Sequence, residues 1–180
     1  SLWSLNNGDG VSLTLEYTGS GYISGSYSGS ISDPYNHYAN LIFTSDDSVS
    51  TTKVYLPFFN GEWWSVMVTK EKGGELGDTF TLHAGNKIYN GNDGTSLGFY
   101  SSSSIVSNNS IWGSAHVSYF PSSNPTITTG GKIYATFSGS YQELRYYSLP
   151  LSQSSFKDYI MNPWMNFDLG GENNILIQSS

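Results

Sequence analysis

The chain has 180 residues, no cysteine and a formal net charge of -7, with aromatic residues at 16% and charged residues at 12%. Binding of nucleic acid through phosphate contacts requires clustered Lys and Arg, and the seven basic residues are scattered, so we exclude that class. The lack of cysteine excludes a disulfide framework, a thiolate zinc site and a cysteine nucleophile. No window of 18 apolar residues occurs, so we expect no membrane insertion.

The composition favours a single all-β domain over residues 1–180. Aromatic side chains suit the pleated surface of a sheet, while the abundant Gly, Asn and Ser suit the turns between strands. A β-sandwich of this length commonly has one core. The chain begins with Ser1 rather than Met, and we expect it to be a domain of a larger protein or a processed product.

The clearest strand lies at residues 11–17. Val11, Leu13, Leu15 and Tyr17 alternate there with polar residues, which predicts one face in the core and one in solvent. Short apolar runs predict further strands at 39–44, 53–56, 63–68, 79–84, 87–89, 97–100, 112–120, 132–137, 139–147 and 175–177. We expect the last of these to pair beside the first strand of the chain.

Turn signals divide this series of strands. The Asn-Gly pair at 60–61 predicts a tight hairpin between the strands before and after it. The Gly-Asn pair at 85–86 likewise divides residues 79–89 into a second hairpin. The serine run at 101–104 is interpreted as a connection between strands.

Large aromatic residues are expected to dominate the core. Full burial of one such ring is worth about 1.5–3 kcal/mol, so a few of them could hold two sheets together without a disulfide. The candidates are Trp63 or Trp64, Trp112, Phe137 and Tyr146.

Residues 137–163 change period from strand to helix. The alternating half predicts a strand in which Arg145 pairs with Glu143, two residues away on the same face, or with a carboxylate of a neighbouring strand. After Pro150, Ser152 has the place of an N-cap, and apolar residues follow at helical spacing until Asn-Pro at 162–163. We therefore predict one short helix near 152–161.

Two motifs resemble laminin-G-like domains of the concanavalin A-like superfamily. The first is a Gly-x-Trp strand start at Gly61 and Trp63, with Trp64 where the family often has His. The second is a strand followed by a leucine-serine and a short helix, met by Gly139, Tyr141, Glu143, Leu144, Arg145, Tyr146, Tyr147, Leu151 and Ser152. The resemblance implies a jelly-roll β-sandwich of two antiparallel sheets.

The superfamily also contains glycoside hydrolases, so catalysis has to be considered. A retaining glycosidase needs two carboxyl groups about 5–5.5 Å apart, and the enzymes of this superfamily place them on a Glu-x-Asp-x-x-Glu strand. That pattern is missing from the sequence; Glu71 and Glu75 are close in sequence, but two glycines separate them. His37, His83 and His116 have no partner spacing and are interpreted as structural. We expect no enzyme activity.

Calcium is a candidate cofactor, because the resemblance implies rim loops that often bind it. Calcium prefers several oxygen ligands, and the loops that offer them contain Asp46 and Asp47, and residues 90–93. Both loops also have ordinary turn composition, so both interpretations stay open.

A glycan site is the other candidate. Sugar recognition combines an aromatic surface with polar groups that satisfy hydroxyls. The candidate residues are Asp33, Tyr35, Asn36, His37, Tyr38, Asn90, Asn92 and Asp93. A tyrosine-rich loop is equally suited to packing or to a protein partner.

The function predicted from these features is binding or display without catalysis. Residues 151–163 resemble laminin-G-like modules in structural proteins of large viruses and phages. The resemblance implies a module of a capsid, fibre, tail or cell surface, on a virion or outside the cell. Its partners would be a glycan or protein receptor, or other subunits of an assembly. A lectin-like carbohydrate-binding module is the alternative, and a glycoside hydrolase with an unrecognised site is the second alternative.

Overall fold

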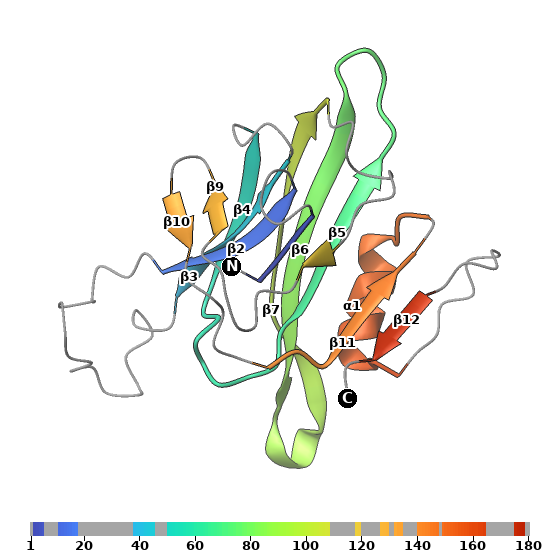
Figure 1. The fold of residues 1–180 in the computed structure, drawn as a ribbon. Helices are drawn as coiled ribbons and strands as arrows, with labels where there is room; N and C mark the ends of the chain where they lie inside the picture. The colour runs from blue at the N-terminus through green and yellow to red at the C-terminus, as the bar shows by residue number, and fades with distance from the viewer. Residues whose placement is uncertain are drawn as a thin grey trace.

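The computed structural model describes residues 2–5, 11–17, 38–45, 50–108, 118–119, 127–129, 132–134, 140–147, 149–164 and 175–178. This part of the chain is mostly β, with antiparallel pairing throughout and one short α-helix (Figure 1). Two sheets contain most of the strands, and two further pairs of strands are separate.

The first sheet has the order β4-β3-β2-β1-β8. Its members are β1 (Trp3–Leu5), β2 (Ser12–Tyr17), β3 (Ala39–Thr44), β4 (Thr51–Leu56) and β8 (Ser118–Tyr119). The predictions at 11–17, 39–44 and 53–56 are therefore confirmed as strands. β4 ends directly before Pro57, which has no N–H to donate to a ladder.

The second sheet has the order β5-β6-β7 and is built from longer strands. β5 spans Ser65–Glu71, β6 spans Asp78–Tyr89 and β7 spans Thr95–Ser107. The ends of β6 and β7 run past the neighbouring strands as a two-stranded arm, which closes through the 3₁₀ turn Gly91–Asp93 (Figure 1).

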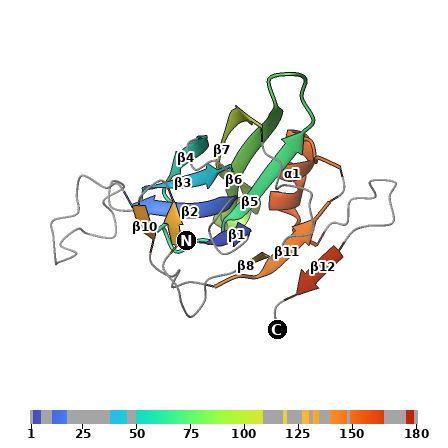
Figure 2. The same cartoon turned by 45° about the horizontal axis from the view of Figure 1, so that its top comes forward.

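The remaining elements lie at the C-terminal side of the chain. β9 (Ile127–Thr129) pairs with β10 (Lys132–Tyr134), and β11 (Glu143–Tyr146) pairs with β12 (Ile175–Gln178). The helix α1 (Gln153–Met161) lies beside the second sheet (Figure 2).

The two large sheets face each other across one core. Phe43 of the first sheet stacks on Phe80 of the second, with ring centroids 5.6 Å apart. The edge strands β4 and β7 lie side by side, and a buried hydrogen bond of 2.8 Å joins Ser45 Oγ to Ser107 Oγ beside them. The arrangement is sandwich-like, and the buried core consists of Trp3, Val11, Leu13, Leu41, Phe43, Val54, Leu56, Phe80, Leu82 and Ala84.

Of the aromatic residues expected in the core, the structure describes the side chains of Trp63 and Trp64. Trp64 packs against the core, whereas Trp63 is exposed. The side chains of Trp112, Phe137 and Tyr146 lie outside the described residues.

Both predicted hairpins are wrong. β4 pairs with β3 rather than β5, so the Asn-Gly pair at 60–61 turns a loop that crosses from one sheet to the other. Residues 78–89 form one strand, and the Gly-Asn pair at 85–86 is an irregularity in its register with β7. Asn86 Oδ1 accepts a hydrogen bond of 2.8 Å from the Phe99 N–H there, so a side chain takes over a ladder bond.

Three further expectations are corrected. The serine run at 101–104 lies inside β7 and pairs with β6. β12 is a strand as predicted, but its partner is β11 rather than the first strand. Ser12 and Thr14, expected in solvent, are 0% and 1% exposed, so the polar face of β2 is also covered.

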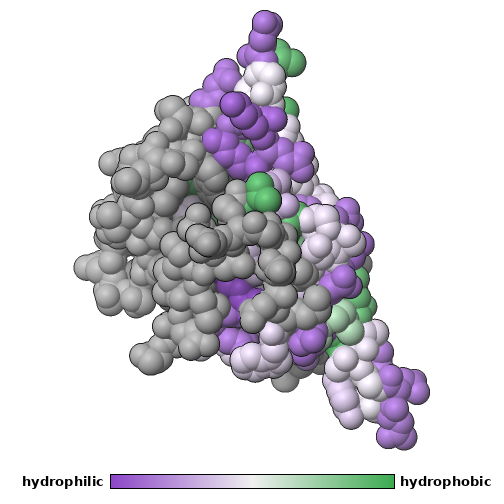
Figure 3. Space-filling model, turned by 90° about the vertical axis from the view of Figure 1, so that its right-hand side faces the viewer, coloured by the Kyte–Doolittle hydropathy of each residue, from purple (hydrophilic) through white to green (hydrophobic). Residues whose placement is uncertain are grey.

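The surface on the α1 side is mostly polar over the described residues. Figure 3 shows small, separated apolar spots on this face. No described helix has the length and apolarity needed to cross a membrane.

Candidate functional site

The structure describes only some of the predicted site residues. Asp33, Tyr35, Asn36 and His37 lie outside the described residues, as do the predicted metal ligands Asp46 and Asp47. Tyr38 precedes β3, and its ring centroid is 5.0 Å from that of Tyr55 on β4. Asn90, Asn92 and Asp93 are exposed at the end of the β6–β7 arm. The structure therefore does not bring Asn90 and Tyr38 together through any contact among the described residues.

The side chain of Asn90 stabilises the turn in which it lies. Asn90 Nδ2 donates to Ser96 Oγ at 2.7 Å, and the Asn90 N–H donates to the Gly94 carbonyl at 2.7 Å. Asp93 donates its N–H to the Asn90 carbonyl at 3.3 Å. Within the described ranges there is no group of three His, Cys, Asp or Glu side chains that could hold a metal ion.

The aromatic loop, residues 57–64 between β4 and β5, is the most distinctive surface feature of the described chain. It crosses from the first sheet to the second, as the teal segment of Figure 1. Phe58 packs against Trp64 at 4.7 Å, and Trp64 in turn stacks on Phe99 of β7 at 6.2 Å between ring centroids. One side of the loop is therefore anchored on the core.

Asn60 determines the conformation of this loop. Its Oδ1 accepts hydrogen bonds from the Glu62 N–H at 3.0 Å and from Trp64 Nε1 at 3.2 Å. Gly61 has φ +81°, in the left-handed region that favours glycine. The Asn-Gly pair therefore lies in a turn, as its composition indicated. This turn joins two sheets rather than two paired strands.

Trp63 takes no part in this anchor. It is 59% exposed and has no hydrogen bond or ring contact with any described residue. Tyr55 and Phe59, which flank the end of β4, are about half exposed. The sequence did contain a signal for this site. Consecutive side chains of an extended segment point to opposite sides, so two adjacent tryptophans cannot both enter one core.

A second polar centre lies under α1. His83 Nδ1 and Tyr100 Oη are 2.8 Å apart, Phe156 of α1 packs 5.9 Å from the His83 ring, and Lys157 Nζ lies 4.4 Å from the Tyr100 centroid. Burial lowers the pKa of His83 and raises the pKa of Tyr100. His83 is only 6% exposed, so this cluster attaches the helix to the sheet, and the structural interpretation of this histidine fits its surroundings.

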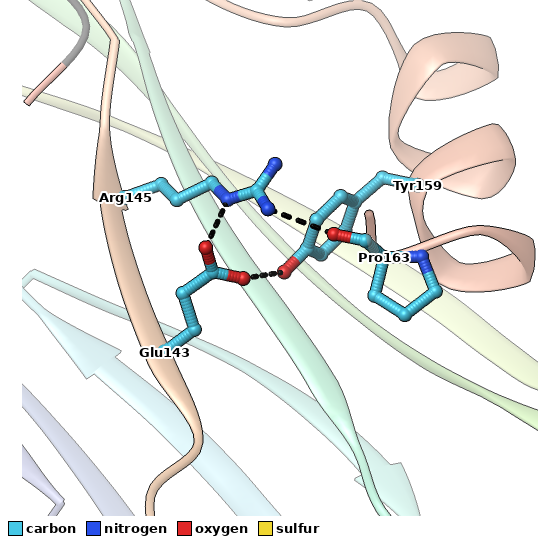
Figure 4. A network of polar contacts seen from close by, with 4 residues as sticks. All are labelled: Glu143, Arg145, Tyr159 and Pro163. Atoms are coloured by element: carbon cyan, nitrogen blue, oxygen red, sulfur yellow. Dashed lines mark hydrogen bonds and ion pairs between the residues drawn. The ribbon is translucent and has the colours of Figure 1, made fainter. Parts of the chain in front are cut away.

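The third polar centre joins α1 to β11 (Figure 4). Arg145 Nε donates to Glu143 Oε1 at 2.7 Å, which confirms the predicted pair, and Arg145 Nη2 donates to the Pro163 carbonyl at 2.8 Å. Tyr159 of α1 donates to Glu143 Oε2 at 3.2 Å. Burial and the charge of Glu143 raise the pKa of Tyr159 to about 12, so the phenol stays protonated as a donor.

The electrostatics of this network favour a charged Arg145. Burial alone would lower the pKa of the guanidinium, but hydrogen bonds with Glu143 and Tyr147 raise it. The Tyr159 ring lies 4.9 Å from the Arg145 guanidinium carbon, which adds a cation–π contact. The contacts drawn in Figure 4 join Glu143 and Arg145 of β11 to Tyr159 of α1 and to the Pro163 carbonyl that follows it, so the network attaches the helix to β11.

Comparisons with known proteins identify no relative. No protein-family model matches the chain, and neither a curated protein nor a solved structure with significant similarity was found.

Proposed function

We propose that the chain is a non-catalytic binding and display module with a laminin-G-like jelly roll of the concanavalin A-like type. Two antiparallel sheets with a shared core support this fold. The order of β11, the N-cap Ser152 and α1 supports it as well, since that order is part of the motif on which the resemblance depends.

The aromatic loop is the observation on which the binding function depends. Trp63 of this loop is exposed, and Phe59 of the same loop and Tyr55 near the end of β4 are about half exposed. Leaving large rings in water forgoes a burial energy of about 1.5–3 kcal/mol each, and grouped exposed apolar side chains mark interaction sites. The module would mediate attachment of a larger structural protein on a virion or outside the cell, a setting supported by the sequence resemblance alone.

A carbohydrate-binding, lectin-like module is the second candidate. The position of Trp63 directly after Glu62 and three residues after Asn60 favours it, because sugar sites combine an aromatic face with hydrogen-bonding groups. Calcium dependence belongs to the same hypothesis, with Asp46 and Asp47 as its predicted ligands.

Adhesion of protein-coated beads tests the proposal. Fluorescent beads that carry many copies of the chain should adhere to intact cells or to secreted glycoproteins, and Trp63→Ser should abolish this adhesion. Trp164→Ser is the matched control, because Trp164 is 78% exposed but lies after α1. Equal adhesion by both variants would contradict the assignment of the aromatic loop.

Two further measurements complete the test. Release of reducing sugar from the same glycoproteins or from polysaccharides would overturn the non-catalytic assignment. Adhesion measured with and without a chelator separates a calcium-dependent lectin from a metal-independent module.

A further inference from the structure

We propose that the β6–β7 arm, residues 86–99, joins two copies of this chain, with the two arms lying antiparallel about a two-fold axis. This inference goes beyond the proposed function, because it depends on other side chains than those of the aromatic loop. It follows from the exposed apolar side chains of the arm and from the placement of its two charges.

The arm has no third strand to shield it. The pairing of β5 with β6 ends at Gly85, and beyond this residue β6 pairs with β7 alone among the described strands. The arm therefore extends past the rest of the second sheet, at the bottom of Figure 1. A two-stranded ribbon buries little surface and is only marginally stable in water, so a further contact would stabilise it.

Apolar side chains lie on both faces of this ribbon. Directly paired residues of antiparallel strands point to the same face, and so do residues two apart on one strand. Leu97 is paired with Lys87, and Tyr89 is two residues from Lys87, so these three side chains share one face, whereas Ile88 lies on the other. Tyr89 is 76% exposed, and Ile88 and Leu97 are partly exposed. A ribbon that only faced solvent would carry polar residues on at least one face.

The arm is held at both ends by hydrogen bonds. At its base, Asn86 Oδ1 accepts the Phe99 N–H at 2.8 Å. At its tip, the Asn90 N–H donates to the Gly94 carbonyl and Asn90 Nδ2 donates to Ser96 Oγ, both at 2.7 Å. Since the arm is ordered before it meets a partner, association does not have to order it.

The charges of the arm favour a second copy as its partner. Lys87 at the base and Asp93 at the tip are its only charged residues, and both are exposed. Neither has an ion-pair partner among the described residues. Two antiparallel arms bring each Lys87 toward the Asp93 of the other copy, so one patch is complementary to itself, as a two-fold interface requires. The arm has no net charge in a chain of -7, so it meets its own copy without local repulsion.

Sedimentation equilibrium is the direct test. We expect the unmodified chain to form a dimer, and Tyr89→Ser to weaken dimerisation about tenfold or more. Lys87→Glu should also weaken it, and Asp93→Lys added to Lys87→Glu should restore it, because the exchange recreates both ion pairs with reversed sign. Leu76→Ser is the matched control, because Leu76 is 86% exposed but lies between β5 and β6, at the other end of the second sheet. Thermal unfolding of each variant confirms that it folds.

The outcomes separate this inference from the proposed function. A monomer at every soluble concentration overturns the inference, as does a dimer that Tyr89→Ser and Lys87→Glu leave unchanged. A double variant that dimerises as weakly as Lys87→Glu alone overturns the antiparallel arrangement and the inference with it. None of these results affects the binding module, because bead adhesion that requires Trp63 is measured separately. Adhesion that does not require Trp63 contradicts the aromatic loop and leaves the dimer standing.

Discussion

At the scale of single residues, Asn60 has more influence on the candidate site than its size suggests. One carbonyl oxygen accepts two hydrogen bonds, from the Glu62 N–H and the Trp64 indole. Asn60→Ala should lower the free energy of unfolding by about 1–3 kcal/mol, since each of the two bonds contributes roughly 0.5–1.5 kcal/mol. Urea denaturation measures the change, and Asn92→Ala, at an exposed turn position where the side chain has no hydrogen bond with the described residues, should stay within about 0.5 kcal/mol. An unchanged stability in Asn60→Ala would show that the loop does not depend on this side chain.

His83 makes stability depend on pH. Burial lowers its pKa below 6.5, so the unfolded chain takes up a proton at higher pH than the folded chain does. Stability should therefore be constant above pH 6.5 and fall as the pH drops from 6.5 toward the folded pKa of His83. The lowered pKa of Asp78, held by its hydrogen bond with Lys70, affects stability only below about pH 4.

The comparison with His83→Gln isolates this titration from those of the other histidines. The variant should lose part of the slope of unfolding free energy between pH 7 and 5, measured by urea denaturation at several pH values. Identical slopes in both proteins would contradict the assignment.

At the scale of elements, α1 is the part that local sequence predicts best. Ser152 accepts the Ser155 N–H at 3.1 Å as an N-cap, and Phe156 and Ile160 are buried, as the helical spacing indicated. These signals are local, because caps and apolar spacing act within a few residues. The sequence predicted only part of the attachment of the helix. It indicated the Glu143–Arg145 pair, but not the hydrogen bond from Tyr159, because that bond joins residues 16 positions apart.

Removing members of this network should have graded effects. Glu143→Ala leaves the largely buried Arg145 without its carboxylate and should cost about 1.5–3 kcal/mol, whereas Tyr159→Phe removes one bond and should cost about 0.5–1.5 kcal/mol. Chemical denaturation gives both values, with the exposed Gln142→Ala as control. A larger loss in Tyr159→Phe than in Glu143→Ala would reverse the roles assigned here.

The long strand β6 shows why strand boundaries were predicted less well. The Gly-Asn pair at 85–86 has turn composition, yet Gly85 is used for close packing: a Cβ there would lie 2.8 Å from Ile160 Cδ1 of α1. Asn86 is buried and replaces a ladder bond. Both roles depend on partners far away in the chain, so local composition indicated a turn instead.

Asn86→Ala tests the irregularity in β6. The Phe99 N–H would lose its acceptor, at a cost of about 1–3 kcal/mol, offset in part because the buried Asn86 Nδ2 has no hydrogen-bond partner within the described part of the chain. Hydrogen exchange should show reduced protection of the Phe99 amide, with little change at the Leu82 amide in the middle of β6. Unchanged exchange at Phe99 would contradict the role of Asn86.

At the scale of the whole molecule, the sequence indicated two facing sheets. It did not indicate that the outer face of β2 is buried as well. Alternation in β2 predicted its inner face correctly, yet Ser12 and Thr14 on the other face are also buried. Thr14 and Thr44 Oγ1 have no hydrogen-bond partner among the described residues, a cost that alternation cannot reveal. Pairing partners of β4, β6 and β12 were likewise missed, because pairing depends on the topology of the whole chain.

The shared core predicts cooperative unfolding of the two large sheets. Phe80 is fully buried and stacks on Phe43 of the opposite sheet, so Phe80→Ala removes contacts from both sheets at once. We expect a loss of about 3–5 kcal/mol and a single urea transition with coincident near-UV and far-UV circular dichroism curves. Val106→Ala, half exposed on the same sheet, should cost about 0.5 kcal/mol or less. Separate transitions for the two signals would mean that the sheets fold independently, because a core that both sheets need cannot be lost from only one of them.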